Sequence, residues 1–151
     1  MEIEKLLQEK TEELIKHLSI SGTVSTGHDD EENVYEVQIT ADRDAGLLIG
    51  GHGSALAAIQ SFLAMYLRVE TGDWVQVSVD VDGWRRKQED QLVELARQAA
   101  SRARQTGEPQ NLYNLTPGER RVVHMALIDE KGVKTESKGE DRERYLVITA
   151  E

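Results

Sequence analysis

The first forty residues alternate between a helical and a strand-like pattern of hydrophobic positions. Apolar side chains recur at helical spacing over residues 2–18, which predicts one amphipathic helix. Residues 22–28 and 34–40 then bracket an acidic loop, and in the second segment apolar and polar side chains alternate. Alternation of this kind is typical of a half-buried strand. The two segments therefore predict a hairpin with a long acidic turn.

Two apolar helical segments follow, separated by three glycines within four positions. The first is a short helix ending at Ile49, which Asp42 or Asp44 can cap, and the second begins at Ser54, which can cap it in turn. The second helix has one apolar face and ends near residue 71. Four alternating valines over residues 75–81 then predict a strand. The order of elements is helix, strand, strand, helix, helix, strand.

The second half of the chain begins with a long helix over residues 84–106, which has an alanine-rich face and ends before Pro109. Thr116 and Pro117 begin another helix, which runs to about Asp129. Two strands are predicted over residues 133–137 and 144–149. These patterns predict an α+β chain in which a first unit, 1–83, is joined by a connecting helix, 84–107, to a second small α/β unit, 108–151.

Composition favours a cytoplasmic protein. The chain has 151 residues and no cysteine, which excludes disulfides and cysteine metal sites. The N-terminal segment is acidic and amphipathic rather than a signal peptide, and no later segment approaches the roughly 20 apolar residues of a membrane span. We therefore expect a protein that is not itself a membrane protein.

The distribution of charge decides how the net charge of −10 is interpreted. A strongly acidic chain repels the phosphates of nucleic acid. Residues 1–82 contain 5 Lys and Arg against 16 Asp and Glu, whereas residues 83–151 contain 13 against 12. The acidic character therefore belongs to the first half, and the second half is free to contact an anion.

Three interpretations of the glycines at positions 50, 51 and 53 compete. A dinucleotide or P-loop site requires the glycines to follow a strand, and the further motif residues are absent. A tight corner between two helices needs glycine only for the backbone. The third interpretation is a loop in which backbone replaces side chains so that a phosphate approaches the following helix.

The run Ile49-Gly50-Gly51-His52-Gly53, placed between two helices, resembles the Gly-x-x-Gly loop of KH domains, and the order of elements resembles the type II KH fold. The resemblance implies a site for single-stranded RNA made of Ile49, Gly50, Gly51, His52, Gly53 and Ser54. The two variable positions of such loops are often basic, and here they are Gly51 and His52. His52 is either a phosphate contact or a polar loop residue.

A second group of polar residues lies on the predicted helix after Thr116. Arg120 and His124 are four residues apart and therefore share a face. A histidine beside an apolar stripe is more often a hydrogen-bonded structural residue than a catalytic one. The Arg-x-x-x-His spacing, however, resembles the R-3-H module for single-stranded nucleic acids. That resemblance implies binding roles for Arg120 and His124, and by extension for Arg121 and Lys134.

A KH unit followed by an R-3-H module resembles the bacterial Jag family, also called KhpB or SpoIIIJ-associated proteins. Three phrases support it, namely Asp-Ala-Gly-Leu-Leu-Ile-Gly, Val-Asp-Gly-Trp-Arg and Glu-Arg-Arg-x-Val-His. Members often carry a further N-terminal Jag domain and a charged linker, which this sequence does not contain. We therefore expect a short form or a truncated chain.

The resemblance implies a non-enzymatic RNA-binding protein that regulates gene expression after transcription and is connected with cell elongation and division. Its implied partners are single-stranded RNA, with single-stranded DNA as an alternative, and a small single-KH protein or a second copy of the chain. The rival hypothesis is an adaptor whose acidic KH unit binds protein, including a membrane-insertase tail. We expect no cofactor and no metal, because no nucleophile, metal cluster or nucleotide loop stands in a workable context.

Overall fold

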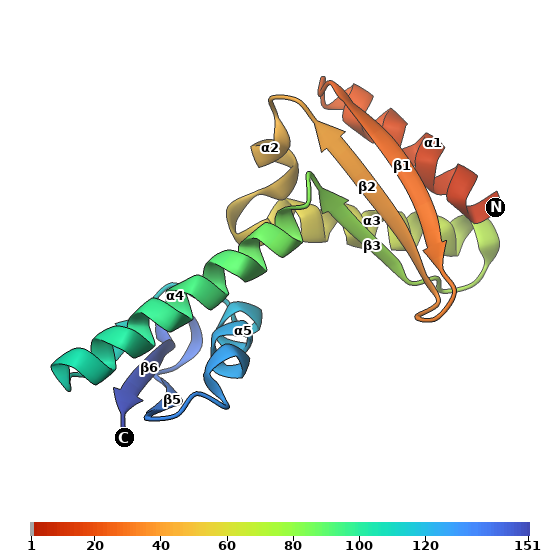
Figure 1. The fold of residues 1–151 in the computed structure, drawn as a ribbon. Helices are drawn as coiled ribbons and strands as arrows, with labels where there is room; N and C mark the ends of the chain where they lie inside the picture. The colour runs from red at the N-terminus through yellow and green to blue at the C-terminus, as the bar shows by residue number, and fades with distance from the viewer. Residues whose placement is uncertain (1) are drawn as a thin grey trace. The chain divides into compact units, whose positions relative to one another are not determined.

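The computed structural model describes residues 2–151 and has a mixed α/β architecture with two three-stranded sheets (Figure 1). The chain divides into two compact units, one ending at Arg85 and the other comprising residues 86–151. This agrees with the α+β class predicted from the sequence. Each sheet belongs to one unit and packs against helices of that unit.

The first unit has the order of elements predicted from the sequence. Its elements are α1 (Glu2–His17), β1 (Gly22–Asp29), β2 (Val34–Ala41), α2 (Ala45–Ile49), the 3-10 turn η1 (Gly51–Gly53), α3 (Ser54–Thr71) and β3 (Val77–Val81). The acidic turn is shorter than expected, because Asp29 still belongs to β1. Val75 precedes β3 rather than beginning it.

The sheet of the first unit has the order β1-β2-β3. β1 and β2 form an antiparallel hairpin, whereas β2 and β3 run parallel. A parallel pair needs a crossover connection, and α2, η1 and α3 supply it. Figure 1 shows α1 and α3 on the same side of the sheet, where Leu7, Leu56 and Leu63 are fully buried against Val37 and Val79.

The predicted helix caps of the first unit are wrong. Ser54 does not cap α3, because it already has helical dihedral angles (φ −63°, ψ −41°) and Gly53 occupies the N-cap position. Asp44 is at the N-cap position of α2 but makes no side-chain cap hydrogen bond. Both helices therefore begin without a side chain that accepts from their first N–H groups.

The second unit is built on a long helix and an antiparallel sheet of order β4-β6-β5. Its elements are α4 (Trp84–Thr106), which begins in the first unit, then β4 (Gln110–Leu112), α5 (Pro117–Leu127), β5 (Val133–Lys138), the 3-10 turn η2 (Asp141–Glu143) and β6 (Tyr145–Ala150). β4 was not predicted from the sequence, because three residues are too few to show alternation. The cap of α5 is confirmed as a capping box between Thr116 and Glu119.

The alanine-rich face of α4 lies in the core of the second unit. Ala96, Ala100 and Ala103 are fully buried there, together with Val123 of α5 and Ile148 of β6. The segment 84–107, expected as a connecting helix, thus contributes one wall of the second core.

One segment, Ala45–Thr71, is long and apolar enough to cross a membrane by length and composition alone. The expectation that no segment approaches a membrane span is therefore wrong on composition. In the structure this segment forms two helices, because the positive φ angles of Gly50 (71°) and His52 (54°) interrupt the helical backbone. α3 also buries Leu56, Leu63 and Leu67 within the first unit. The apolar composition of the segment is therefore explained by a helix that packs in the core of the unit.

Candidate nucleic-acid interface

The glycine loop joins α2 to α3 through backbone that only some residues adopt easily. Gly50 and Gly53 have φ values of 71° and 78°, and His52 between them has a φ of 54°. Positive φ carries little steric cost for glycine but is strained for residues with a Cβ atom. Two of the three glycines are therefore required by the turn itself.

The surroundings of the three glycines differ. A Cβ atom on residue 50 would lie 2.7 Å from the backbone nitrogen of Ala55, and one on residue 53 would lie 2.6 Å from the Trp84 ring. A Cβ atom on Gly51 would meet nothing within 4 Å. Gly50 and Gly53 are thus explained by close packing within the fold, whereas Gly51 leaves open space at the surface.

The open position lies beside the first turn of α3. Gly51, His52 and Ser54 are exposed, while Ile49 is half-buried against the core. Because Gly53 at the N-cap has no side chain, no side-chain hydrogen bond caps the first turn. Uncapped N–H groups and the helix dipole favour an anion at this end of a helix. The backbone N–H groups at the start of α3 are therefore available as hydrogen-bond donors, and no side chain of Gly51 or Gly53 covers them.

In the second unit, Arg120 and His124 lie on one face of α5 and are both held in place. Arg120 Nη1 donates a hydrogen bond of 2.6 Å to the carbonyl oxygen of Leu115. His124 Nδ1 is hydrogen-bonded to the hydroxyl of Thr135 on β5. The arginine thus supports the segment that leads into α5, and the histidine ring is fixed against the sheet.

Arg121 and Lys134 lie on other surfaces. Arg121 lines a groove of about 420 Å³ between α4 and α5, together with Val93 and Met125. Lys134 is adjacent to Thr135 on β5, so its side chain leaves the opposite face of the sheet. The structure therefore brings Arg120 and His124 together, but it places neither Arg121 nor Lys134 beside them.

Tyr113 and Tyr145 were not among the site residues predicted from the sequence. Their ring centroids lie 5.0 Å apart with an interplanar angle of 37°, and Tyr113 is 62% exposed. Tyr113 directly follows β4, the strand that the hydrophobic pattern did not reveal. Without β4 no signal in the sequence places these two rings side by side.

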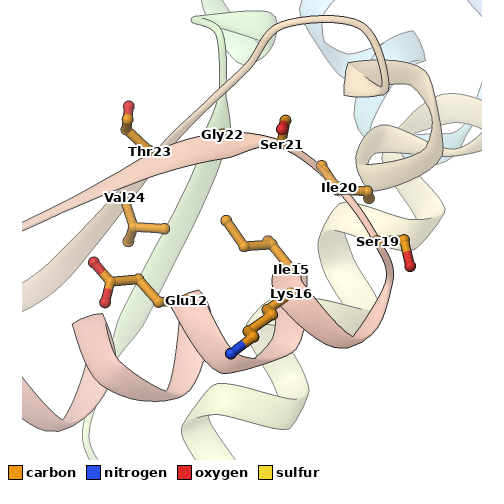
Figure 2. A pocket seen from close by; sticks show the side chains of 9 residues that line it. All are labelled: Glu12, Ile15, Lys16, Ser19, Ile20, Ser21, Gly22, Thr23 and Val24. Atoms are coloured by element: carbon orange, nitrogen blue, oxygen red, sulfur yellow. The ribbon is translucent and has the colours of Figure 1, made fainter.

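A surface hollow of about 650 Å³ lies between the end of α1 and the start of β1 (Figure 2). Figure 2 shows Glu12 and Lys16 on the helix side and Thr23 and Val24 pointing in opposite directions from the strand. None of the residues predicted to bind nucleic acid lines it. Within residues 2–151, no group of three or more His, Asp and Glu side chains is placed to hold a metal ion.

Residues 90–150 match the family model that describes the R-3-H domain. The match begins inside α4, which agrees with the burial of that helix in the second core. It includes Arg120, His124 and the whole β4-β6-β5 sheet.

Three curated relatives align with most of the chain, and each is named RNA-binding protein KhpB. The protein of Clostridium symbiosum is 28% identical over 147 residues, which are 95% of this chain and 66% of the relative. That of Bacillus subtilis is 29% identical over 133 residues, 87% of this chain and 64% of the relative. That of Lactiplantibacillus plantarum is 30% identical over 131 residues, 76% of this chain and 41% of the relative.

The chain thus spans between about two fifths and two thirds of the length of these relatives. The alignments extend over both units, while the family match is confined to the second. The chain therefore carries an R-3-H domain over residues 90–150, and over both units it is similar to the curated proteins named KhpB, the name also used for the Jag family.

Proposed function

We propose that this chain binds single-stranded RNA and catalyses no reaction. The observation that carries the proposal is the first turn of α3, where no side chain caps the helix and Gly51 leaves open space beside it. A phosphate at this position would accept hydrogen bonds from backbone N–H groups at the positive end of the helix dipole. The relatives are named RNA-binding proteins, which supports RNA as the ligand.

We assign the first unit, residues 1–83, to the type II KH fold. Its order of elements, its mixed sheet and the Gly-x-x-Gly loop between α2 and α3 support this assignment. KH loops clamp the backbone of about four nucleotides. Ile49, Gly50 and Gly53 would shape the loop, while Gly51, His52 and Ser54 would face the RNA.

The second unit would supply the positively charged side chains that are scarce in the first unit. Residues 1–85 contain 6 Lys and Arg against 16 Asp and Glu, whereas residues 86–151 contain 12 of each. We place the sheet and α5 of the R-3-H module within 108–151, while helix 84–107 both links the module to the KH domain and forms one wall of its core. Arg120 and His124 would contact the RNA backbone, and Arg121 and Lys134 would contribute from neighbouring surfaces.

The biological role that we propose is regulation of gene expression after transcription in the bacterial cytoplasm, connected with cell elongation and division. This role rests on the similarity of the chain to the KhpB proteins. Single-stranded DNA is the competing ligand, because both nucleic acids offer phosphates to the same loop. A 2′-hydroxyl is what distinguishes RNA from DNA at a given site.

Fluorescence anisotropy with a mixed-sequence single-stranded RNA tests the proposal. Binding at about 50 mM salt should weaken at about 200 mM, with a log-log slope of roughly −0.7 for each phosphate contacted. Single-stranded DNA and duplex RNA of the same length are the matched ligands. Absence of binding to any of them at low salt would overturn the RNA proposal.

The second candidate function is that of a protein adaptor, which an exposed apolar row on α3 favours. Phe62, Met65 and Val69 are 45%, 61% and 81% exposed, and they lie on the side of α3 away from Leu63 and Leu67. Contiguous exposed apolar side chains are typical of an interaction surface. Because the row lies on one regular helix, a second copy of the chain or a small single-KH protein would dock helix against helix.

Sedimentation of the whole chain over a range of concentrations tests the adaptor function. A dimer that Met65→Glu dissociates would support the exposed face of α3 as the interface, with Glu70→Gln as a matched exposed control on the same helix. A chain that remains monomeric at all concentrations, alone and mixed with a single-KH protein, would contradict it.

A further inference from the structure

The sheet of the second unit has one buried and one open face. Leu146 and Ile148 of the central strand β6 are buried in the core that α4 and α5 complete. Alternate side chains of a strand point to opposite faces, so Tyr145, Val147 and Thr149 belong to the other face. Val147 is buried there between its cross-strand neighbours, and Tyr145 and Thr149 are half-buried. On the flanking strands the side chains of that face are exposed, namely Asn111, Lys134, Glu136 and Lys138.

The strand register places these side chains in cross-strand rows. Lys138 is opposite Tyr145, and Lys134 is opposite Thr149. Leu112 is opposite Leu146, so Tyr113, the next residue, extends the row of Tyr145 and Lys138. The contact of the two tyrosine rings, with centroids 5.0 Å apart, agrees with this register.

The two rings are held in position. The hydroxyl of Tyr113 accepts a hydrogen bond of 3.1 Å from the side-chain amide of Asn111, two residues earlier on the same face. Tyr113 is nevertheless 62% exposed. A cross-strand aromatic pair stabilises a sheet, but a ring as exposed as that of Tyr113 also leaves aromatic surface accessible to a ligand.

The charges around the rings suit a polyanion. Lys138 lies beside Tyr145, and Lys134 lies toward the other end of the same strand. Neither lysine forms an ion pair or a side-chain hydrogen bond with any residue from 2 to 151. Glu136 between them is the one acidic side chain among the outward-facing residues of the three strands.

We propose that this open sheet face is a second RNA-binding surface, on which unpaired bases stack against Tyr113 and Tyr145 while Lys134 and Lys138 contact phosphates. Aromatic side chains that present a π-face accept any base, so the surface would bind single strands with little sequence preference. A duplex would bind poorly because its bases are stacked on each other. The proposal rests on the proposed RNA binding and assigns it a surface apart from the glycine loop and from the Arg120–His124 pair.

A cycle that combines a protein variant with a modified RNA tests stacking directly. Tyr113→Ala should weaken binding of a single-stranded RNA about 5-fold or more, because base–aromatic stacking is worth at least about a factor of five per base. An RNA of equal length with several abasic sites should bind the unmodified protein more weakly. Tyr113→Ala should then cause little further loss, because the bases that the ring contacts are already missing.

Two variants control for side effects. Tyr113→Phe keeps the ring and removes only the hydroxyl, so it should bind within about 2-fold of the unmodified protein. Ile128→Ala removes an apolar side chain of comparable exposure elsewhere on the second unit and should leave binding unchanged. Urea unfolding of each variant shows whether the fold is intact.

Substitutions of the acidic and the basic residues of this face should change RNA affinity in opposite directions. Glu136→Gln should tighten RNA binding, because it removes the negative charge between the two lysines. Lys138→Met should weaken it and make the salt slope less negative by roughly 0.7. An effect of Glu136→Gln in the other direction would contradict the proposed surface.

The outcomes separate this proposal from the one on which it rests. If the unmodified chain binds no single-stranded RNA, both proposals fail together. If it binds RNA and Tyr113→Ala binds equally well, the stacking surface alone is overturned. The surface is also overturned if Tyr113→Ala weakens the intact and the abasic RNA by the same factor, because the ring then acts only through the fold.

Discussion

The Trp84 ring occupies the space where a side chain of residue 53 would stand. Its Cη2 and Cζ3 atoms lie 2.6 and 2.7 Å from the position of a Cβ atom on Gly53. The absence of a side chain at Gly53 therefore makes room for the Trp84 ring of the same unit rather than for a ligand. This contact ties the beginning of α4 to the glycine loop and makes Gly53 a requirement of folding.

Gly53→Ala should destabilise the first unit by about 2–4 kcal/mol, because the new methyl group clashes with Trp84 and residue 53 has a positive φ. Urea denaturation measures the loss. Combining it with Trp84→Leu, which removes the ring, should recover part of the steric cost, so the two changes should not be additive. Strictly additive free energies would contradict the contact.

Gly51→Asp combined with His52→Asp should weaken RNA binding and leave the stability nearly unchanged. Gly51 has open space for a side chain, and aspartate tolerates the positive φ of residue 52 better than most residues. Two negative charges beside the first turn of α3 would repel a phosphate. Anisotropy measures the affinity, and Gly51→Asn with His52→Asn is the neutral control. Equal affinity in the Asp and Asn variants would identify the loop as a corner only.

Arg120 and Arg121 should behave differently although they are adjacent. Arg120→Ala leaves the Leu115 carbonyl without its donor and should destabilise the second unit by about 1–2 kcal/mol. Arg121→Ala should change stability by less than about 0.5 kcal/mol, because Arg121 is exposed. Both should weaken RNA binding. Thermal unfolding and anisotropy together distinguish the two, and an equal stability loss would contradict the assigned contacts.

Thr135→Val should release the His124 ring from β5. Valine has nearly the shape of threonine but offers no hydroxyl, so the hydrogen bond to Nδ1 is lost. The ¹⁵N chemical shifts of the ring should change, and RNA affinity should fall by about 2- to 5-fold, because the ring is no longer fixed against the sheet. Thr135→Ser, which keeps the hydroxyl, should leave both unchanged.

Most of the fold was predictable because its elements have strong local signals. The helical spacing of α1 and the alternation of β2 and β3 each reflect one buried face. The start of α5 is likewise indicated by Thr116 followed by Pro117. β4 has only three residues, and its pairing with β6 is a long-range relationship that no local pattern contains.

The site was less predictable than the fold. Helical spacing correctly places Arg120 and His124 on one face, because four residues make about one turn. Helical spacing cannot predict that Arg121 lines a groove between α4 and α5, or that Lys134 lies on one face of the sheet. The separate roles of Gly50, Gly51 and Gly53 also depend on tertiary neighbours, above all on Trp84, which is distant in sequence.

The parallel pairing of β2 with β3 has a consequence for folding kinetics. The β1–β2 hairpin closes across a short turn, whereas the segment between β2 and β3 contains α2, η1 and α3 and is much longer. Closing a longer loop costs more chain entropy and slows the contacts that depend on it. Residues of the glycine loop should therefore become ordered late, so that substitutions there accelerate unfolding far more than they slow folding.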